Sequence, residues 1–363
     1  MPIRQLKSAG ARCGLPLAFC GVALAAMVLG GCSKENSELG NTPAGGAAPK
    51  GTTNAGGPTG AKKKILFVFK VGGISYSEAC RAGAQQANDD PALNAEVTYQ
   101  APVNASADQQ GQIIDQAIVN HVDAIVVSPN DAAAIVPVIH KATQAGIKVF
   151  TWDSDAPASE RQFYVAAADD IQIGSDIFAA VAKGIGDKGD VLIFSGGQTA
   201  ENLNKHLEGI QNEAAKHPNV HILSPIVYNN DDKSLATQMA TQKLTQYPNV
   251  AGIACVNSPS PAAAGQALRT THRVGKVKVW GLGLPSENKP YLEDGSVTGL
   301  YLWDPQKLTY LTAKLVIDAL NGKNPTNGQA IPGEKGMIVV SDKTVTLPLR
   351  LEINKANVDS LKF

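Results

Sequence analysis

Several features on which catalytic and cofactor-binding proteins depend are missing from this sequence. Its 363 residues contain no G-x-x-x-x-G-K-[ST] loop, no G-x-G-x-x-G fingerprint after the first predicted strand and no G-x-S-x-G elbow. These absences argue against nucleotide-dependent and serine-hydrolase chemistry. The six histidines lack the spacing of metal ligands, and most are expected at the surface. With no basic cluster to indicate a nucleic-acid partner, the sequence predicts no catalytic residues, no metal and no cofactor.

Cysteines are also few, five in all. Two of them, Cys13 and Cys20, lie in the N-terminal segment, and Cys32 closes that segment. The remaining pair, Cys80 and Cys255, lies on segments that we expect in different lobes of the protein. A disulfide framework is therefore not expected, and the hydrophobic cores must hold the fold.

The N-terminal segment has the pattern of a secretory signal that ends at a lipid-modified cysteine. Three basic residues precede an apolar stretch that begins near Leu15, too short and too rich in Gly and Ala for a good membrane span. The stretch ends in Leu-Gly-Gly-Cys, which looks like the lipobox of bacterial lipoproteins. We predict a lipoprotein signal peptide over residues 1–31 and a lipidated Cys32. An ordinary signal peptide with an incidental cysteine is the alternative.

A flexible linker is predicted over residues 32–61. After Cys32 this segment is almost all Ser, Asn, Thr, Pro, Gly, Ala and Lys, and Leu39 is its one large apolar side chain. Such a composition buries too little apolar surface to offset the entropy of ordering. Removing the three basic residues of the signal leaves 29 basic against 32 acidic residues, a net charge of about −3. The sequence thus predicts a protein outside the cytoplasm, in the periplasm or at the cell surface, that meets the membrane only through its lipid.

From Lys64 onward, apolar strands alternate with amphipathic helical patterns. The strands are predicted from continuous apolar runs, which are typical of strands covered on both faces of a sheet. They lie at 65–70, 96–100, 124–128, 147–152, 191–195, 221–228, 250–256, 276–282 and 297–303. This alternation predicts an α/β fold with two doubly wound parallel-sheet lobes.

Parallel sheets bind ligands beyond the carboxyl ends of their strands, so the residues that follow each strand are the candidates for a site. Trp152 and Asp153 follow one strand. A carboxylate accepts hydrogen bonds from neighbouring sugar hydroxyls, and an indole offers a flat apolar face to the C–H groups of a sugar ring. We expect Asp153 to contact a ligand and its neighbour Asp155 to belong to a turn. For Trp152, a place in the core is equally open.

Trp303 and Asp304 repeat this pattern after the last strand, although Pro305 also makes Asp304 a natural helix N-cap. We favour a ligand role for both residues. The remaining candidates each have a competing local role, such as helix packing, capping or simple solvation. They are Lys70, Tyr76, Glu201, Asn202 and Asn257. Asp231 and Asp232 are interpreted as an acidic pair that opens a helix.

At these residues the chain resembles type I periplasmic binding proteins of the sugar-binding class, which serve ABC importers. The nearest groups that we suggest bind ribose, rhamnose or autoinducer-2. The resemblance covers residues 64–363 and is carried by five segments. They are 69–87, 149–157, 228–250, 281–305 and 353–363.

The resemblance implies two lobes joined by a three-segment hinge. The hinge segments are expected near Ala167–Asp169, Leu302–Asp304 and Thr346–Pro348. The N-terminal lobe is then expected to hold residues 62–168 plus 305–345. The C-terminal lobe is expected to hold residues 169–304 plus 346–363.

Lys70, Asp153 and Asp304 match ligand-contacting residues of the autoinducer-2 group. That group has Asp-Gln where this chain has Glu201-Asn202, and it has Pro and Ala at the positions of Cys255 and Asn257. Asn257 is similar to the Asn or Asp with which sugar binders contact hydroxyls. The resemblance therefore favours a monosaccharide or related polyol as ligand, with autoinducer-2 as the rival.

The predicted function is a monomeric, non-enzymatic solute-binding lipoprotein that delivers a small neutral sugar to an ABC permease. Two other functions stay open at this stage. The same protein could present its ligand to a chemoreceptor or sensor kinase, or it could be an extracellular enzyme of doubly wound architecture. The missing elbow, metal set and acid–base pair argue against the enzyme.

Overall fold

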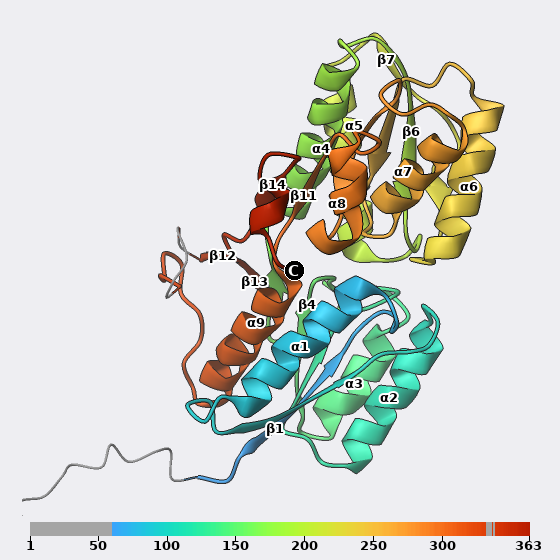
Figure 1. Cartoon of the computed structure of the whole chain (residues 1–363). Coiled ribbons are helices and arrows are strands. Elements are labelled where there is room, and N and C mark those ends of the chain that lie inside the picture. The colour runs from blue at the N-terminus through green and yellow to red at the C-terminus, as the bar shows by residue number, and fades with distance from the viewer. Residues whose placement is uncertain (1–59, 332–335, 337) are drawn as a thin grey trace, which may run out of the picture. The chain divides into compact units, whose positions relative to one another are not determined.

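The computed structural model describes residues 60–331, 336 and 338–363. The predicted signal peptide, Cys32 and nearly all of the predicted linker lie outside these residues. The described chain contains two sheets of seven strands each (Figure 1). No helix of the described residues is long and apolar enough to cross a membrane.

The sheet of the N-terminal lobe forms around the first apolar strand. From β1 outward, every neighbouring pair is parallel except the hairpin of β12 and β13 at one edge. In spatial order the strands are β12 (Val339–Ser341), β13 (Thr344–Thr346), β5 (Tyr164–Ala166), β4 (Lys148–Trp152), β3 (Ala124–Val127), β1 (Lys63–Val68) and β2 (Ala95–Gln100). Phe67 and Val68 of β1 point to opposite faces and are both wholly buried, as expected for a sheet covered on both sides.

The helices of this lobe are α1 (Ser75–Asp89), α2 (Ala107–Val119), α3 (Val136–Gln144) and α9 (Pro305–Leu320). Figure 1 shows α1 and α9 side by side, although more than 200 residues separate them in the sequence. The Ser106 side chain accepts a hydrogen bond from the Gln109 N–H at 3.3 Å and so caps α2.

The sheet of the C-terminal lobe is also parallel, except for its edge strand β14. In spatial order the strands are β14 (Leu351–Ile353), β11 (Gly299–Leu302), β10 (Lys278–Leu282), β9 (Gly252–Cys255), β6 (Gly189–Ser195) and β7 (Val220–Ile222), with β8 (Val227–Tyr228) also paired to β6. The helices are α4 (Asp170–Gly184), α5 (Glu201–Ala214), α6 (Lys233–Gln246), α7 (Ser260–Thr270), α8 (Pro285–Glu293) and the 3-10 turn η1 (Val358–Ser360). Two parallel α/β lobes are thus confirmed.

The strand predicted over 221–228 is wrong as a single element. The chain forms β7 and β8 there, and the intervening residues, which include Pro225, leave the ladder. Proline has no N–H to donate to a sheet, which accounts for the interruption. The short strands β5, β12, β13 and β14 were not predicted, because three-residue strands carry too little periodicity to be recognised.

The chain passes between the two sheets three times. It leaves β5 for α4, returns from β11 to α9, and leaves β13 for β14. Two of these passages end in capped helices: Asp169 accepts from the Gln172 N–H at 3.0 Å, and Asp304 accepts from the Lys307 N–H at 3.2 Å. Each cap fixes the residue at which the chain enters the next lobe.

Helices α4 and α5 approach closely through two glycines. A Cβ at Gly174 of α4 would lie 1.8 Å from the His206 carbonyl oxygen of α5. Reciprocally, a Cβ at Gly209 of α5 would lie 1.9 Å from the Ile171 carbonyl oxygen of α4. Only glycine permits this approach, so the two backbones lie in direct contact.

Candidate functional site

A cavity with about 480 Å³ of empty space is lined by residues from both lobes. Its walls combine charged and amide groups with aromatic and aliphatic side chains, as in many small-molecule sites. The lining residues are Phe69, Lys70, Val71, Ile74, Tyr76, Asp153, Asn202, Leu203, His206, Asp231, Val256, Asn257, Ser258, Leu282, Leu302 and Trp303. The described residues contain no group of three or more His, Cys, Asp or Glu side chains suited to hold a metal ion.

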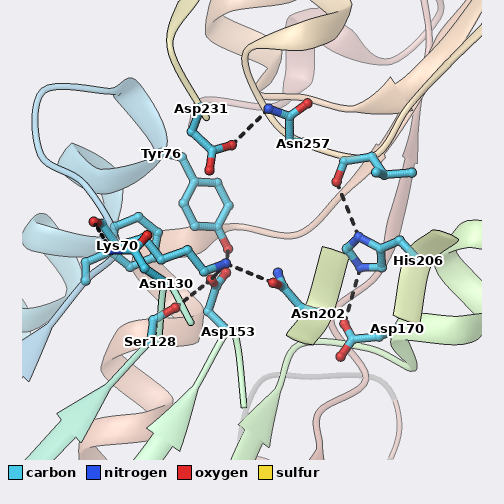
Figure 2. Close-up of polar contacts among 12 residues, drawn as sticks. Lys70, Tyr76, Ser128, Asn130, Asp153, Asp170, Asn202, His206, Asp231 and Asn257 are labelled. Atoms are coloured by element: carbon cyan, nitrogen blue, oxygen red, sulfur yellow. Dashed lines mark hydrogen bonds and ion pairs between the residues drawn. The ribbon is translucent and has the colours of Figure 1, made fainter. Parts of the chain in front are cut away.

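The Asp153 carboxylate lies at the end of β4 and is almost fully buried. One oxygen accepts a hydrogen bond from the Tyr76 hydroxyl at 2.8 Å. The other accepts from the Ser128 hydroxyl at 2.9 Å and lies 3.0 Å from the Lys70 ammonium (Figure 2). A carboxylate offers about four lone-pair positions. Three donors therefore leave Asp153 with room for roughly one hydrogen bond from a ligand.

Lys70 connects the two lobes. It follows β1 in the N-terminal lobe, and its ammonium donates to the Asn202 side-chain oxygen, on α5 of the C-terminal lobe, at 2.9 Å. Both residues are 6% exposed. The backbone carbonyl of Lys70 accepts a hydrogen bond from the Asn130 amide at 2.7 Å, which holds the loop after β1. The Lys70 ammonium therefore lies between the two lobes, where a ligand in the cavity can contact it.

Tyr76 and Trp303 form an aromatic wall. Their rings meet edge to face with centroids 6.5 Å apart, and the Trp303 indole N–H donates to the Tyr76 hydroxyl at 2.8 Å. Burial, followed by the charge of the nearby Asp153, raises the pKa of Tyr76 well above its ordinary value. The phenol is therefore protonated at neutral pH and acts as a donor to Asp153. Trp303, which follows β11 at a passage between the lobes, is thus connected to the N-terminal lobe.

In the C-terminal lobe, a network of amides lies beside the cavity. The Asn257 amide nitrogen donates to the Asn229 side-chain oxygen at 2.8 Å and to Asp231 at 2.9 Å. The Ser260 hydroxyl donates to the Asn257 side-chain oxygen and accepts from the Asn229 amide. Asn257 and Asn229 are buried, and every polar atom of their side chains has a partner. The network fixes the orientation of the Asn257 amide at the cavity wall.

Most of the histidines lie at the surface, as expected, and His206 is the exception. It is wholly buried on α5, faces the cavity, and contacts the Val256 carbonyl oxygen through Nδ1 at 3.3 Å. Its Nε2 lies 3.3 Å from a carboxylate oxygen of Asp170 (Figure 2). The Asp170 carboxylate also accepts from the Tyr164 hydroxyl at 3.0 Å. A polar chain thus runs from the cavity to the start of α4.

The structure brings six of the nine predicted ligand residues to the cavity wall. They are Lys70, Tyr76, Asp153, Asn202, Asn257 and Trp303. Trp152, Glu201 and Asp304 are not among the lining residues. The first group comes from five separate parts of the sequence, and each part follows a strand of one of the two sheets.

The three other residues have structural roles in this conformation. Trp152 is wholly buried in the core, with its ring 5.2 Å from that of Phe67, so the core position left open for it is the one observed. Glu201 lies in the first turn of α5 and pairs with Lys205 at 3.8 Å. Asp304 caps α9, as Pro305 at the next position had indicated. This geometry favours the capping role of Asp304 over the ligand role.

Sequence reasoning missed Asp231. As expected for a helix-opening residue, Asp232 caps α6 by accepting from the Leu235 N–H at 2.8 Å. Asp231 instead turns to the cavity and accepts from Asn257. Its backbone has a φ of 58°, a left-handed conformation that aspartate tolerates better than most residues. The sequence did contain a signal, the pair of adjacent aspartates. One aspartate suffices to cap a helix, so the second was available for another role.

Asp155 also differs from the expectation of an ordinary turn residue. It is buried, and its carboxylate forms a bidentate pair with Arg161. The Thr151 hydroxyl and the Ala156 N–H donate to the same carboxylate at 2.6 and 2.7 Å. Asp155 therefore stabilises the loop after β4, behind Asp153, and does not line the cavity.

Comparison with known proteins places this geometry in a family. The chain matches the model of the periplasmic binding protein domain over residues 65–324. A D-ribose/D-allose-binding protein of Pseudomonas aeruginosa is 26% identical over 246 residues, which cover 66% of this chain and 74% of that protein.

Two solved structures share the fold. An ABC transporter solute-binding protein of Clostridium phytofermentas with bound L-rhamnose has a TM-score of 0.76 and 26% identity, and covers 83% of this chain and 98% of its own. LsrB of Clostridium saccharobutylicum in complex with AI-2 has a TM-score of 0.75 and 25% identity, and covers 83% of this chain and 100% of its own. The chain therefore belongs to the periplasmic binding protein family, whose members bind solutes and are not enzymes.

Proposed function

We propose that this protein is an extracytoplasmic solute-binding lipoprotein that captures a small neutral sugar between its lobes and delivers it to an ABC-type import permease. The observation that carries this proposal is the composition of the cavity wall. Buried hydrogen-bonding groups, Lys70, Asp153 and Asn202 among them, lie beside the aromatic pair of Tyr76 and Trp303. Such a wall suits a ring that has hydroxyls on its edge and C–H groups on its faces.

The charges in the cavity also favour a neutral ligand. Lys70 is already held by Asp153 and Asn202. A sugar acid would need a cation of its own, because a buried unpaired charge is costly. Hydroxyls, in contrast, can donate to the remaining lone pairs of the carboxylates and accept from the ammonium. The ligand contacts that we propose are the six cavity-lining residues predicted from the sequence.

The lobes of the protein are suited to close on such a ligand. A sugar that contacts both lobes stabilises the closed form by its differential affinity for that form. Relatives of this family include components of ABC importers, which supports transport as the purpose of capture. The Leu-Gly-Gly-Cys motif supports attachment of the protein to the membrane through a lipid on Cys32.

Autoinducer-2 is a second candidate ligand. Two observations favour it. Lys70 and Asp153, two of the residues that match the autoinducer-2 group, both line the cavity. A structural neighbour is in complex with AI-2. Asn257 favours the sugar. Its side-chain amide lies at the cavity wall, at a position where the autoinducer-2 group has alanine.

A thermal-shift panel tests both candidates. The mature domain, residues 60–363, is screened against pentoses, hexoses, deoxyhexoses and autoinducer-2. A ligand that binds the native state adds about 2.7 kcal/mol to the free energy of unfolding when its concentration is 100 times Kd. The melting temperature therefore rises with ligand concentration. A shift with a sugar supports the proposal, and a shift with autoinducer-2 alone replaces it with the second candidate. No shift with any member of the panel would contradict both.

A further inference from the structure

A second carboxylate faces the cavity from the lobe opposite Asp153. Asp231 lies just before α6, is partly buried, and uses one oxygen to accept a hydrogen bond from Asn257 at 2.9 Å (Figure 2). Among the residues that the structure describes, none donates a hydrogen bond to its second oxygen. One acceptor of Asp231 is therefore left for a group that enters the cavity.

The position of this carboxylate is fixed before any ligand binds. The Asp231 backbone N–H donates to the Asn229 side-chain oxygen at 3.1 Å, and the same oxygen accepts from Asn257 at 2.8 Å. Gly196, at the end of β6, provides the space: a Cβ there would lie 2.5 and 2.7 Å from the two Asp231 carboxylate oxygens. Groups held in this way lose little freedom when they bind a ligand.

The charge of Asp231 has no cation bonded to it in the described structure. Lys70 is bonded to Asp153 and Asn202 instead. Burial raises the pKa of Asp231, an effect that the charge of Asp153 reinforces and that Lys70 and the Asn257 hydrogen bond oppose. The fold therefore bears the cost of a buried carboxylate that its own contacts only partly offset. Such residues are expected where function requires them.

We propose that Asp231 is a further specificity-determining residue, which accepts a hydrogen bond from a ligand hydroxyl and so acts as the counterpart of Asp153 on the C-terminal lobe. This inference rests on the proposed function, because it assumes that the cavity binds a polyol. With Asp153 on one lobe and Asp231 on the other, a bound sugar donates hydroxyl protons to both lobes. Hydrogen bonds from the sugar to both carboxylates then stabilise the closed form.

The test uses two variants chosen for the left-handed backbone at this position. Asp231→Asn keeps the shape and removes the charge, and Asp231→Gly removes the side chain while tolerating a φ of 58°. Affinity is measured by calorimetry with the sugar that gives the largest shift in the thermal panel. Asp231→Gly is expected to weaken binding at least tenfold. Asp231→Asn is expected to weaken it less, because the amide keeps one acceptor but loses the charge that strengthens the bond.

Asp232→Asn is the matched control. Asp232 is exposed and caps α6, and asparagine caps a helix about as well as aspartate. Its affinity is expected to stay within about threefold of the wild type. Equal losses from Asp231→Asn and Asp232→Asn would overturn the inference, because they would indicate an effect of charge near the helix and not a contact.

Monodeoxy analogues of the same sugar separate direct contact from positioning. For the analogue that lacks the contacted hydroxyl, wild type and Asp231→Asn should bind with equal affinity, whereas the other analogues should keep the difference. A difference that persists for every analogue would assign Asp231 a positioning role and overturn the proposal. Unchanged affinity of both Asp231 variants for the parent sugar would overturn it as well, while leaving the proposed function intact.

The stability of the protein without sugar gives an independent readout. Because burial raises the pKa of Asp231, the folded protein holds its proton more tightly than the unfolded chain, and stability falls as pH rises through that window. Asp231→Asn removes this penalty, so its melting temperature at pH 7 should equal or exceed that of the wild type. A lower melting temperature would mark Asp231 as a structural residue and contradict the inference.

Discussion

The Lys70 ammonium and the Asn202 side-chain oxygen, 2.9 Å apart, form a buried hydrogen bond from one lobe to the other. The same ammonium lies 3.0 Å from Asp153. Lys70 therefore contacts both lobes and lines the cavity in which we propose that the ligand binds. Its removal should affect both binding and lobe closure.

Lys70→Met should lower both affinity and stability. The change leaves the buried Asp153 carboxylate without its cation, and breaking a buried pair from one side typically costs about 3–5 kcal/mol. We expect sugar affinity, measured by calorimetry, to fall at least tenfold, together with a clear drop in melting temperature. Lys63→Met, at the start of the strand that precedes Lys70, is the control, since its pair with Asp123 is exposed and such pairs contribute about 0–1 kcal/mol. Similar effects from Lys63 and Lys70 would argue against the assigned role.

Asp153 and Asp155, two residues apart, should have opposite phenotypes. Asp153→Asn should weaken sugar binding by tenfold or more, because it removes a charged acceptor, whose hydrogen bonds are worth about 1.5–3 kcal/mol. Asn is preferred to Ala here, because Asp153 has a φ of 60°. Asp155→Asn should lower the melting temperature strongly, because it breaks the buried pair with Arg161.

The folded fraction of Asp155→Asn should nevertheless bind sugar within about threefold of wild-type affinity. Calorimetry on protein checked for folding by circular dichroism separates the two effects. A selective loss of affinity in Asp155→Asn, with unchanged stability, would show that Asp155 contacts the ligand after all.

Contacts away from the cavity should also stabilise the closed form. The Ser75 hydroxyl of α1 donates to the Glu287 carboxylate of α8 at 2.9 Å, and Lys233 of α6 lies 3.2 Å from the same oxygen. Glu287→Gln should weaken this contact between the lobes by about 0.5–1.5 kcal/mol and so reduce sugar affinity about two- to tenfold. Small-angle scattering at subsaturating sugar should show a larger radius of gyration than for the wild type.

The control for Glu287 is Glu293→Gln, on the same helix. Among the described residues, the Glu293 carboxylate pairs with Lys289 of the same helix, at 3.8 Å, so this change should leave both affinity and radius unaltered. If Glu287→Gln behaves as this control does, the contact with Ser75 makes no contribution to closure.

Cys32→Ser should block acylation, because serine has no thiol to form the thioether. In cells, the wild-type protein should partition into the detergent phase, and the variant should accumulate with its signal uncleaved. The sugar affinity of the domain should be unchanged, since the cavity-lining residues that the structure describes begin at Phe69. Partitioning of the wild type into the aqueous phase would argue against the lipoprotein assignment.

The sequence predicted the fold more completely than the site. Long apolar runs such as 65–70 and 191–195 identify buried parallel strands, because only strands covered on both faces are apolar at every position. The same reasoning named Lys70 and Asp153 as residues that follow strands, and in the structure the ammonium and the carboxylate lie 3.0 Å apart. At Asp304 the local signal from Pro305 described the observed cap, and the place of Trp152 stayed open because its burial depends on Phe67 from another strand.

The missed residues share a physical reason. His206 and Asp231 take their place in the cavity from tertiary contacts: the approach of α4 to α5 at Gly174 in the first case, and the space beside Gly196 in the second. Neither contact leaves a periodic pattern in the sequence. For His206, a glycine in the middle of a helix, where it costs about 0.5–1 kcal/mol relative to alanine, was the available hint.

The two backbone contacts between α4 and α5 have a mechanical consequence. Gly174 and Gly209 leave no layer of side chains between these helices at their crossing, and side-chain layers are what allow packed helices to slide past one another. Helix α4 begins at Asp170, directly after the first passage between the lobes, whereas α5 carries Asn202 and His206 to the cavity. A rotation of the chain at that passage should therefore move α4 and α5 as one rigid unit, and Asn202 and His206 should change position in the cavity by the same rotation.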